Sequence, residues 1–258
     1  MHAQRKNLVF ESTFDSANSI NKWYERNLLR PASGDVAHDI VRAGSGSFKV
    51  YLNRKTDTTK GPRAELGDNP FQVQSESWYG FSNFFPSNYV SEPATEIINQ
   101  WQSLPDFSLG ETWRSPSLSL QIKSDRFKIA IAWCAATVNT VENTKSTYLD
   151  IGPVSHNQWN DWVFHVKWSY NSGTIQIWKN DSLLLERLNQ PIGYNDVYFP
   201  YFKAGIYKWE WHLLNTVSTT NERSYYFDEI RIGNKAATYN DVRPKSTTPL
   251  LPVSATLW

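Results

Sequence analysis

Alternation of apolar and polar residues with a period of two constrains the fold of this chain more than any other feature. Successive side chains of a β-strand point to opposite faces, so such segments are predicted to be half-buried antiparallel strands. The apolar positions are Phe48, Val50 and Leu52; Leu118, Leu120 and Ile122; Phe127, Ile129, Ile131 and Trp133; and Trp162, Phe164, Val166 and Trp168.

Turn sequences separate further strands of the same kind. Asn171-Ser172-Gly173 and Asn180-Asp181 predict two successive hairpins, whereas short helical turns are expected only at 16–23 and 92–97. Strands do not alternate with helices, which argues against a parallel sheet. We therefore predict an all-β fold of two packed antiparallel sheets, a concanavalin-like jelly-roll sandwich whose concave sheet forms a substrate groove.

The chain has 258 residues, enough for one sizeable core, so we expect one domain over 1–258 with a proline-containing C-terminal extension at about 244–258. The formal net charge of +1 gives no overall attraction to nucleic acid or to an acidic membrane. No apolar run approaches the roughly 18 residues that span a bilayer. We expect a soluble monomer that binds neither nucleic acid nor membranes.

The N-terminus bears on localisation, whereas the single cysteine leaves the redox compartment undecided. Met1 precedes His2-Ala3-Gln4 without a charged or apolar signal region, and a small residue such as Ala3 is what a signal peptidase leaves before its cut. We therefore expect a secreted or periplasmic protein whose signal peptide has been removed. Cys134 is the only cysteine, so an intramolecular disulfide is excluded, and its position in an alternating segment predicts buried packing.

Aromatic residues are abundant, with 12 Trp, 13 Tyr and 13 Phe. Trp and Tyr combine a flat face with a polar tip, which suits the binding of sugars. All-β cores also favour aromatic side chains, so composition leaves both explanations open.

The first segment that carries chemistry is Arg63-Ala64-Glu65-Leu66. Strand alternation would send Arg63 and Glu65 to one face, where they form a charged pair facing outward. The local net charge is +3, from Arg54, Lys55, Lys60 and Arg63 against Asp57. The segment is a candidate contact for a polyanion, and an exposed loop with a structural Arg–Glu pair is the alternative.

The second segment is Asn99-Gln100-Trp101-Gln102. Alternation places Gln100 and Gln102 on one strand face, and Ile97 and Trp101 on the other. An amide can donate to a carboxylate without adding charge, which suits a site where charge moves onto that group during reaction. Exposed glutamines are also common on strands without any function.

The third segment runs from Tyr201 to Tyr207. Alternation places Phe202, Ala204 and Ile206 in the core and the tyrosines, Lys203 and Gly205 on the opposite face. Gly205 is expected to clear space between Lys203 and Tyr207 for a bound ring. A cation beside a phenol favours the phenolate, so Lys203 or Arg63 would make Tyr207 a usable base.

In this order, Arg-x-Glu-Leu, Gln-x-Gln and Tyr-Phe-Lys-Ala-Gly-Ile-Tyr resemble the three signatures of jelly-roll polysaccharide lyases, a group that includes alginate lyases, glucuronan lyases and heparin lyase I. The resemblance extends to the strands at 78–86, 162–168 and 225–233, so it covers most of the chain. It implies β-elimination at C4–C5 of a uronate in an anionic polysaccharide. It also implies that Tyr207 is the catalytic acid and sometimes the base, and that Gln100 neutralises the uronate carboxylate. The residues that would bind substrate are Arg63, which also assists catalysis, Lys203, Gln102, Asn99, Glu65, Tyr201 and Trp209.

One position departs from the pattern. Gln102 stands where such lyases usually have a catalytic histidine, and an amide cannot abstract a proton. The histidines that remain are His38, His156, His165 and His212, with His38 and His212 as the candidates for a second base. For each of the four, a surface or hydrogen-bonded structural role is the alternative. In D-uronates the C5 hydrogen and O4 lie on the same side of the ring, so one tyrosine can serve both. We therefore expect syn elimination on a D-uronate polymer, glucuronan first and mannuronate-rich alginate second.

Two other classes of protein share the predicted fold. A glycoside hydrolase would need spaced carboxylates such as Glu-x-Asp-x-Glu on one strand face, and the sequence has no such run. A non-catalytic carbohydrate-binding module or lectin explains the tryptophans but gives no reason for Gly205 between Lys203 and Tyr207. No cofactor is required, although Glu11 and Asp228 could hold a structural Ca²⁺ if the terminal strands are adjacent; a salt-bridged or solvated pair is the alternative.

Overall fold

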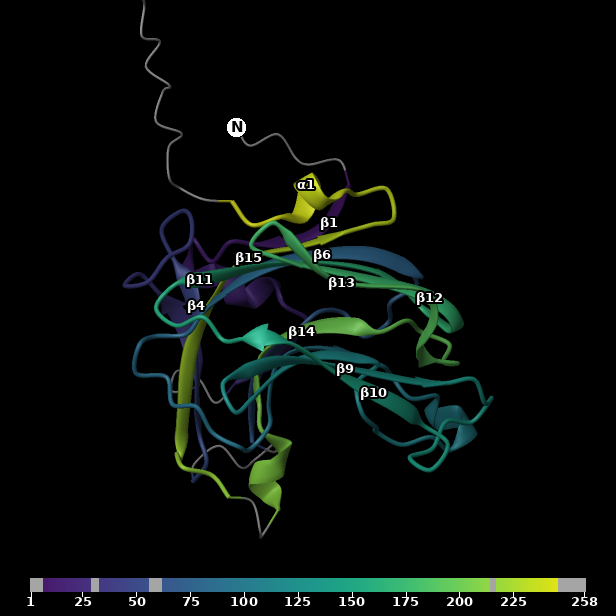
Figure 1. Cartoon of the computed structure of the whole chain (residues 1–258). Helices are drawn as coiled ribbons and strands as arrows, with labels where there is room; N and C mark the ends of the chain where they lie inside the picture. Colours follow the sequence, from purple (N-terminus) through teal and green to yellow (C-terminus); the bar gives the residue numbers. More distant parts are fainter. Residues whose placement is uncertain (1–6, 29–32, 56–61, 214–216, 246–258) are drawn as a thin grey trace, which may run out of the picture.

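Strands make up most of the computed structural model, which describes residues 7–28, 33–55, 62–213 and 217–245. They form two facing layers (Figure 1). The first sheet contains β1 (Leu8–Ser12), β3 (Gly34–Ala37), β4 (Ser47–Asn53), β6 (Glu76–Phe84), β11 (Trp159–Lys167), β12 (Ser169–Lys179), β13 (Ser182–Tyr194) and β15 (Glu222–Gly233). The second contains β2 (Glu25–Asn27), β5 (Arg63–Gly67), β7 (Glu96–Gln102), β8 (Leu118–Lys123), β9 (Arg126–Cys134), β10 (Lys145–Pro153) and β14 (Tyr201–Tyr207). The predicted all-β sandwich is confirmed.

Strand pairing is antiparallel throughout the described residues, with one exception that joins the two sheets. The order is β2-β5-β14-β7-β8-β9-β13-β12-β11-β6-β15-β4-β3, with β1 beside β15 and β10 beside β9. At the junction, Gly193 and Tyr194 of β13 pair in parallel with Trp133 and Cys134 of β9. Hydrogen bonds therefore run without a break from one layer to the other.

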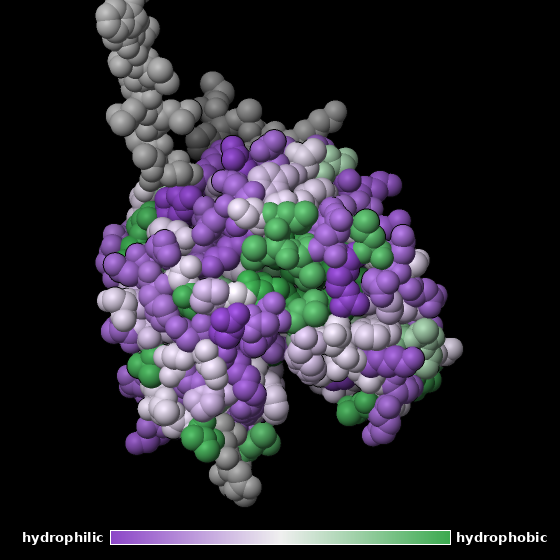
Figure 2. All heavy atoms as spheres, in the orientation of Figure 1, coloured by the Kyte–Doolittle hydropathy of each residue, from purple (hydrophilic) through white to green (hydrophobic). Residues whose placement is uncertain are grey.

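The core lies between the two sheets and is built from the alternating positions. Every apolar residue of the four predicted strands is buried there, except Trp133, which is partly buried. Cys134 is also buried, as predicted. Many contacts in the core are between aromatic rings, such as that of Trp101 with Phe164 at 4.7 Å between centroids. Figure 2 shows apolar side chains in the middle of one face of the molecule, with polar residues around them.

The predicted turns agree with the structure in part. Asn180 and Asp181 join β12 to β13 with φ angles of 48° and 64°, the left-handed pair that a two-residue hairpin requires. Residues 171–173 do not form a free turn but lie inside β12. The strand already begins at Ser169, and both Ser169 and Gly173 pair with β13.

Helical segments are short, namely η1 (Ala17–Lys22), η2 (Phe107–Leu109), η3 (Trp209–His212) and α1 (Tyr239–Val242). The turn expected at 16–23 corresponds to η1. The one expected at 92–97 is wrong, because β7 begins at Glu96 and pairs with β8. No helix in the described part of the chain is long and apolar enough to cross a membrane. Most of the predicted C-terminal extension, 246–258, lies outside the described residues.

Candidate functional site

A groove of about 1000 Å³ lies on the second sheet, on the face turned away from the core. It crosses the sheet from β2 to β10, and its lining includes Arg63, Gln100, Gln102, Lys203 and Tyr207. All three segments singled out in the sequence therefore meet in one groove. The groove contains the largest concentration of the predicted site residues.

Strand register explains how the three segments come together. β14 lies between β5 and β7, so Lys203 stands opposite Gly67 on one side and Gln100 on the other. Tyr207 stands opposite Arg63 and Ile97. The guanidinium carbon of Arg63 lies 4.2 Å from the centroid of the Tyr207 ring, so a cation packs against the phenol as predicted.

The buried carboxylate of Glu65 contacts Gln100, Arg63 and Lys203. Gln100 Nε2 donates to Glu65 Oε1 at 2.5 Å, and Glu65 Oε2 lies 3.7 Å from both Arg63 Nη1 and Lys203 Nζ. The carboxylate is only 2% exposed and is absent from the groove lining, so the expected outward-facing pair is wrong. The carboxylate is buried because the β5–β14 register places Glu65 beside Gly205. From this position Glu65 fixes the Gln100 amide.

A second acid accompanies Lys203. Lys203 Nζ lies 2.9 Å from Glu25 Oε2, and the Tyr201 hydroxyl donates to Glu25 Oε1 at 3.1 Å. Burial, reinforced by the charge of Glu25, raises the pKa of Tyr201 far above its ordinary value. Tyr201 is therefore a neutral phenol that holds Glu25, whereas the Tyr207 ring lies against a cation. Glu25, in the short edge strand β2, had no signal in the sequence.

The side chains of β7 differ from simple alternation. Gln100 and Gln102 both line the groove as predicted, but so does Ile97, while Ile98 takes its place in the core. The register with β8 shifts between Ile97 and Asn99, and this bulge re-aims the strand. Asn99 lies outside the groove lining, is 1% exposed, and donates to the carbonyl of Lys203 at 3.4 Å.

Gln102 has partners of its own. Its amide nitrogen donates to the carbonyls of Ser103 and Arg114, each at 3.2 Å. The residue that replaces the usual histidine therefore holds the loop between β7 and β8 against the strand.

Gly205 is required for a different reason from the one predicted. Its φ is +150°, and a Cβ at this position would lie 2.1 Å from the carbonyl oxygen of Ala64 and 2.7 Å from Cα of Glu65. The space that it leaves is thus filled by the backbone of β5 and not by a bound ring. The close approach of β5 and β14 brings Arg63 to Tyr207.

Exposed aromatic rings surround the groove. Tyr24, Trp113, Tyr148 and Trp209 all line it and are between 41% and 68% exposed. Trp209 was predicted. Tyr24 and Trp113 lie in loops and Tyr148 lies in β10. In these places strand alternation does not show whether a side chain will reach the groove.

None of the four histidines in the described part of the chain lines the groove. His38 contacts the carbonyl of Ser45 at 2.5 Å, and His156 and His165 contact Asp125 and Glu76. His212 is exposed at the end of η3, although Trp209 of the same helix reaches the groove. The structure brings neither candidate for a second base into the groove.

Among the described residues of the predicted basic cluster, only Arg63 lines the groove. Arg54 and Lys55 lie outside the lining, and Arg54 instead packs 5.9 Å from the ring of Trp211. Lys60 and Asp57 fall outside the described residues.

The two carboxylates considered for Ca²⁺ lie on paired strands, as expected of β1 and β15. Each has protein partners. Glu11 Oε1 accepts from Arg231 Nε at 2.7 Å, so Glu11 is salt-bridged, the arrangement expected as the alternative to a Ca²⁺ site. Asp228 accepts backbone N–H groups of Arg42, Ala43 and Glu229, and burial raises its pKa to about 7.

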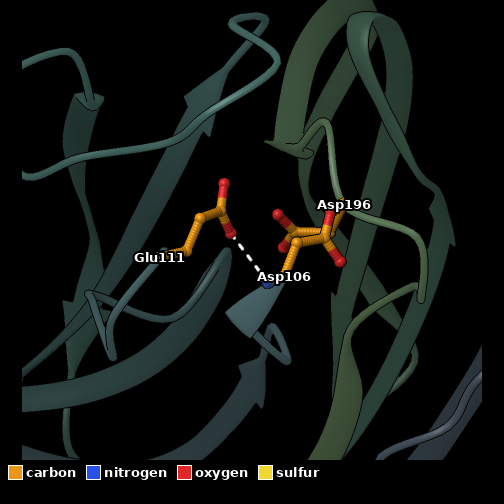
Figure 3. Close-up of side chains that lie close together, drawn as sticks. All are labelled: Asp106, Glu111 and Asp196. Atoms are coloured by element: carbon orange, nitrogen blue, oxygen red, sulfur yellow. Dashed lines mark hydrogen bonds between the residues drawn. The ribbon is translucent and has the colours of Figure 1, made fainter. Parts of the chain in front are cut away.

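A separate group of acids outside the groove lining, Asp106, Glu111 and Asp196, has side chains that lie close together (Figure 3). Arg114 forms ion pairs with both Glu111 and Asp196, and Asn139 donates to the same two carboxylates. Burial, together with the charges of Glu111 and Asp106, raises the pKa of Asp196 to about 7. These contacts anchor the loop that carries Trp113 and Arg114 to the groove. The acids are too far apart in sequence to form a motif.

Comparison with known proteins assigns the family. Residues 12–231 match the family model described as polysaccharide lyase. No curated protein matches the sequence significantly. An endo-β-1,4-glucuronan lyase from the fungus Trichoderma reesei has a similar structure, with a TM-score of 0.79 and 19% identity over 93% of this chain and 99% of that one.

Two further solved structures show how widely the fold is shared. An alginate lyase from a Chlorella virus has a TM-score of 0.51 and 9% identity over 88% of this chain and 100% of that one. The catalytic domain of a glycoside hydrolase family 131 protein from Coprinopsis cinerea has a TM-score of 0.54 and 12% identity over 90% and 96%. Both lyases and hydrolases therefore have this fold, so structural similarity alone does not assign the chain to either class. The match to the family model does. The chain belongs to the polysaccharide lyase family.

Proposed function

We propose that this protein cleaves a uronate-containing polysaccharide by β-elimination, with Tyr207 as both base and acid. The observation that carries the proposal is the placement of Tyr207 in the groove, with Arg63 against its ring and Gln100 on the adjacent strand β7. The phenolate takes the proton from C5 of the uronate. The electron pair forms the C4–C5 double bond, the C4–O4 bond breaks, and O4 takes the proton back from Tyr207.

The negative charge that develops on the uronate carboxylate needs donors fixed in advance. Gln100 uses one N–H for Glu65, which leaves the second N–H of the same amide for the substrate. Because Glu65 is buried and also lies near both Arg63 and Lys203, it holds the donors as one unit. Preorganised donors of this kind act mainly on the transition state.

The exposed rings give the groove its affinity for sugars. Tyr24, Trp113, Tyr148 and Trp209 are spread along its length and present faces on which sugar rings can stack. A groove open along the sheet suits a polymer. Since a polysaccharide of this kind lies outside cells, this function agrees with the prediction that the protein is secreted.

The lack of a histidine in the described groove lining supports a D-uronate substrate. Syn elimination needs one group on one side of the sugar, whereas guluronate and iduronate need a second group across the ring. We therefore expect the highest rate on glucuronan, a lower rate on polymannuronate, and little activity on polyguluronate or heparin.

Initial rates on these four polymers test the proposal, followed by the ultraviolet absorbance of the unsaturated uronate product. Preference for polyguluronate or heparin would refute the single-tyrosine mechanism. Binding to glucuronan without any unsaturated product would identify the protein as a non-catalytic carbohydrate-binding module.

A further inference from the structure

Two tripeptides, one at the start of β7 and one at the end of β14, share an arrangement around the groove. In 95–97 and 207–209 the outer residues line the groove, while the middle residues, Glu96 and Lys208, are 1% and 0% exposed. Glu96 Oε2 and Lys208 Nζ lie 3.7 Å apart. The groove wall is therefore backed by a buried ion pair, directly behind the residue proposed to transfer the proton.

Lys208 is held from several directions. Its ammonium forms an ion pair with Glu92 and donates to the carbonyl of Ala94 at 3.3 Å. Its backbone N–H donates to the carbonyl of Pro62 at 2.9 Å. The side chain thus links the end of β14 to the segment that leads into β7, and its backbone links the same point to the start of β5.

The ion pair belongs to a wider network of Glu92, Glu96, Lys208 and Arg223, called here the buried network. Arg223 Nε donates to Glu96 at 2.5 Å, and Ser218 donates to Glu92 at 2.5 Å. Burial alone would raise the pKa of Glu96, but Arg223 and Lys208 together hold that pKa below its ordinary value. The network thus sets two acidic side chains against two basic ones.

On one side, towards β7, strand pairing is irregular at this part of β14, whereas the pairing with β5 continues to Tyr207. The register of β14 with β7 shifts between Ala204 and Tyr207, and Tyr207 is the last residue of the strand. The buried network begins at the next residue. Buried ion pairs are seldom more stabilising than well-packed apolar side chains, so stability alone does not account for four buried charges here.

We propose that Lys208 is a positioning residue that fixes Tyr207 and Trp209 in the groove wall; this inference rests on the role proposed for Tyr207. Because its ammonium is held by Glu92 and Glu96 and its N–H by the carbonyl of Pro62, Lys208 restricts rotation of the backbone on either side. Tyr207 then keeps the orientation in which its hydroxyl can reach both C5 and O4 of one sugar, and Trp209 keeps its place beside it.

The test compares three variants with the wild type. Lys208→Met removes the cation. Lys208→Met combined with Glu92→Gln also removes the acid that would be left unpaired, and should regain much of the lost stability. Arg231→Met is the matched control, because Arg231 is 2% exposed and ion-paired with Glu11 and Glu229 away from the groove lining.

We expect both Lys208 variants to lose about 10–100-fold in kcat on glucuronan, with KM changed less than about threefold, because misplaced reacting groups lose rate more than affinity. Arg231→Met should lower the melting temperature and leave kcat nearly unchanged. If kcat recovers together with the melting temperature in the double variant, Lys208 is merely structural and the proposal is overturned.

Hydrogen–deuterium exchange provides a readout that does not depend on activity. Peptides covering 204–210 should exchange faster in both Lys208 variants and at the wild-type rate in Arg231→Met. Unchanged exchange in the Lys208 variants would overturn the inference. A wild-type protein that forms no unsaturated product would instead overturn the proposed function, while the exchange result would still decide whether Lys208 orders this segment.

Discussion

Tyr207 is the residue on which the proposed chemistry depends most directly. Its ring packs against the Arg63 guanidinium, so Tyr207→Phe keeps that contact and removes only the hydroxyl. We expect turnover to fall by at least about 10²–10⁴-fold, the contribution typical of a positioned acid or base, with an unchanged melting temperature. Initial rates and thermal unfolding measure both effects. A variant with the wild-type rate would exclude Tyr207 from catalysis.

Gln100 has a counterpart on the same strand that serves as a control. Gln100→Ala should lower kcat by about 10²–10³-fold, because it removes a donor that acts on the developing charge. Gln102→Ala should have a much smaller effect on kcat, since the Gln102 amide is bonded to the carbonyls of Ser103 and Arg114. Steady-state kinetics of the two variants separate these roles. An effect of Gln100→Ala on KM alone would make Gln100 a ground-state binder.

At the residue level, the sequence predicted part of the groove lining but not what holds it in place. Arg63, Gln100, Lys203 and Tyr207 follow from strand alternation and the resemblance. The burial of Glu65 depends on how β5 and β14 pair, which no local pattern specifies. Long-range pairing likewise determines that Glu25 from β2 meets Lys203.

At the level of elements, the approach of β5 to β14 at Gly205 can be tested by substitution. Gly205→Ala would place a Cβ 2.1 Å from the carbonyl oxygen of Ala64 at a φ of +150°. We expect a loss of about 2–5 kcal/mol in the free energy of unfolding, from overlap and backbone strain together. Denaturant titration gives the value.

Gly110→Ala is the control that separates steric overlap from backbone strain. Gly110 also has a positive φ, of +82°, but nothing lies within 4 Å of the added Cβ. Its substitution should cost only the conformational part, about 1 kcal/mol. Equal losses for the two variants would show that the contact with β5 is unimportant.

The strands themselves were predictable because burial on one face leaves a period of two in the sequence. The bulge at Ile97–Asn99 was not, since both Ile97 and Ile98 are apolar and either could face the core. The four-residue helix α1 and the strand start at Glu96 were missed for a related reason. Short elements are determined by tertiary partners, such as the ion pairs of Glu96 with Arg223 and Lys208.

At the level of the whole molecule, the acid group of Asp106, Glu111 and Asp196 should make the free energy of unfolding depend on pH. The folded-state pKa of Asp196 is about 7, above the value of about 3.9 expected in the unfolded chain. Between about pH 4 and pH 7, Asp196 is therefore protonated in the folded state but ionised in the unfolded chain. The contribution of this proton to the free energy of unfolding is fully present below about pH 4 and is lost as pH rises through about 7.

Asp196→Asn should reduce this loss. The amide can still accept from Arg114 and Asn139 through its oxygen, while its nitrogen takes the place of Asp196 Oδ2, a buried atom without a hydrogen-bond partner among the described residues. Melting temperatures from pH 4 to pH 8 should fall less in the variant than in the wild type. Asp228, whose pKa is also about 7, is common to both proteins, so it does not account for a difference. Parallel curves would contradict the assignment.

The junction of β13 with β9 has a mechanical consequence. Because Gly193 and Tyr194 pair with the end of β9, the two layers cannot slide past each other at this corner without breaking hydrogen bonds. At the opposite margin, β2 and β3 end the strand order of the described residues without pairing with each other. Tyr24 and Glu25 lie at that margin and line the groove. We expect relative motion of the two layers to pivot at this junction, with β2 moving together with β14, because Lys203 and Tyr201 of β14 bind Glu25.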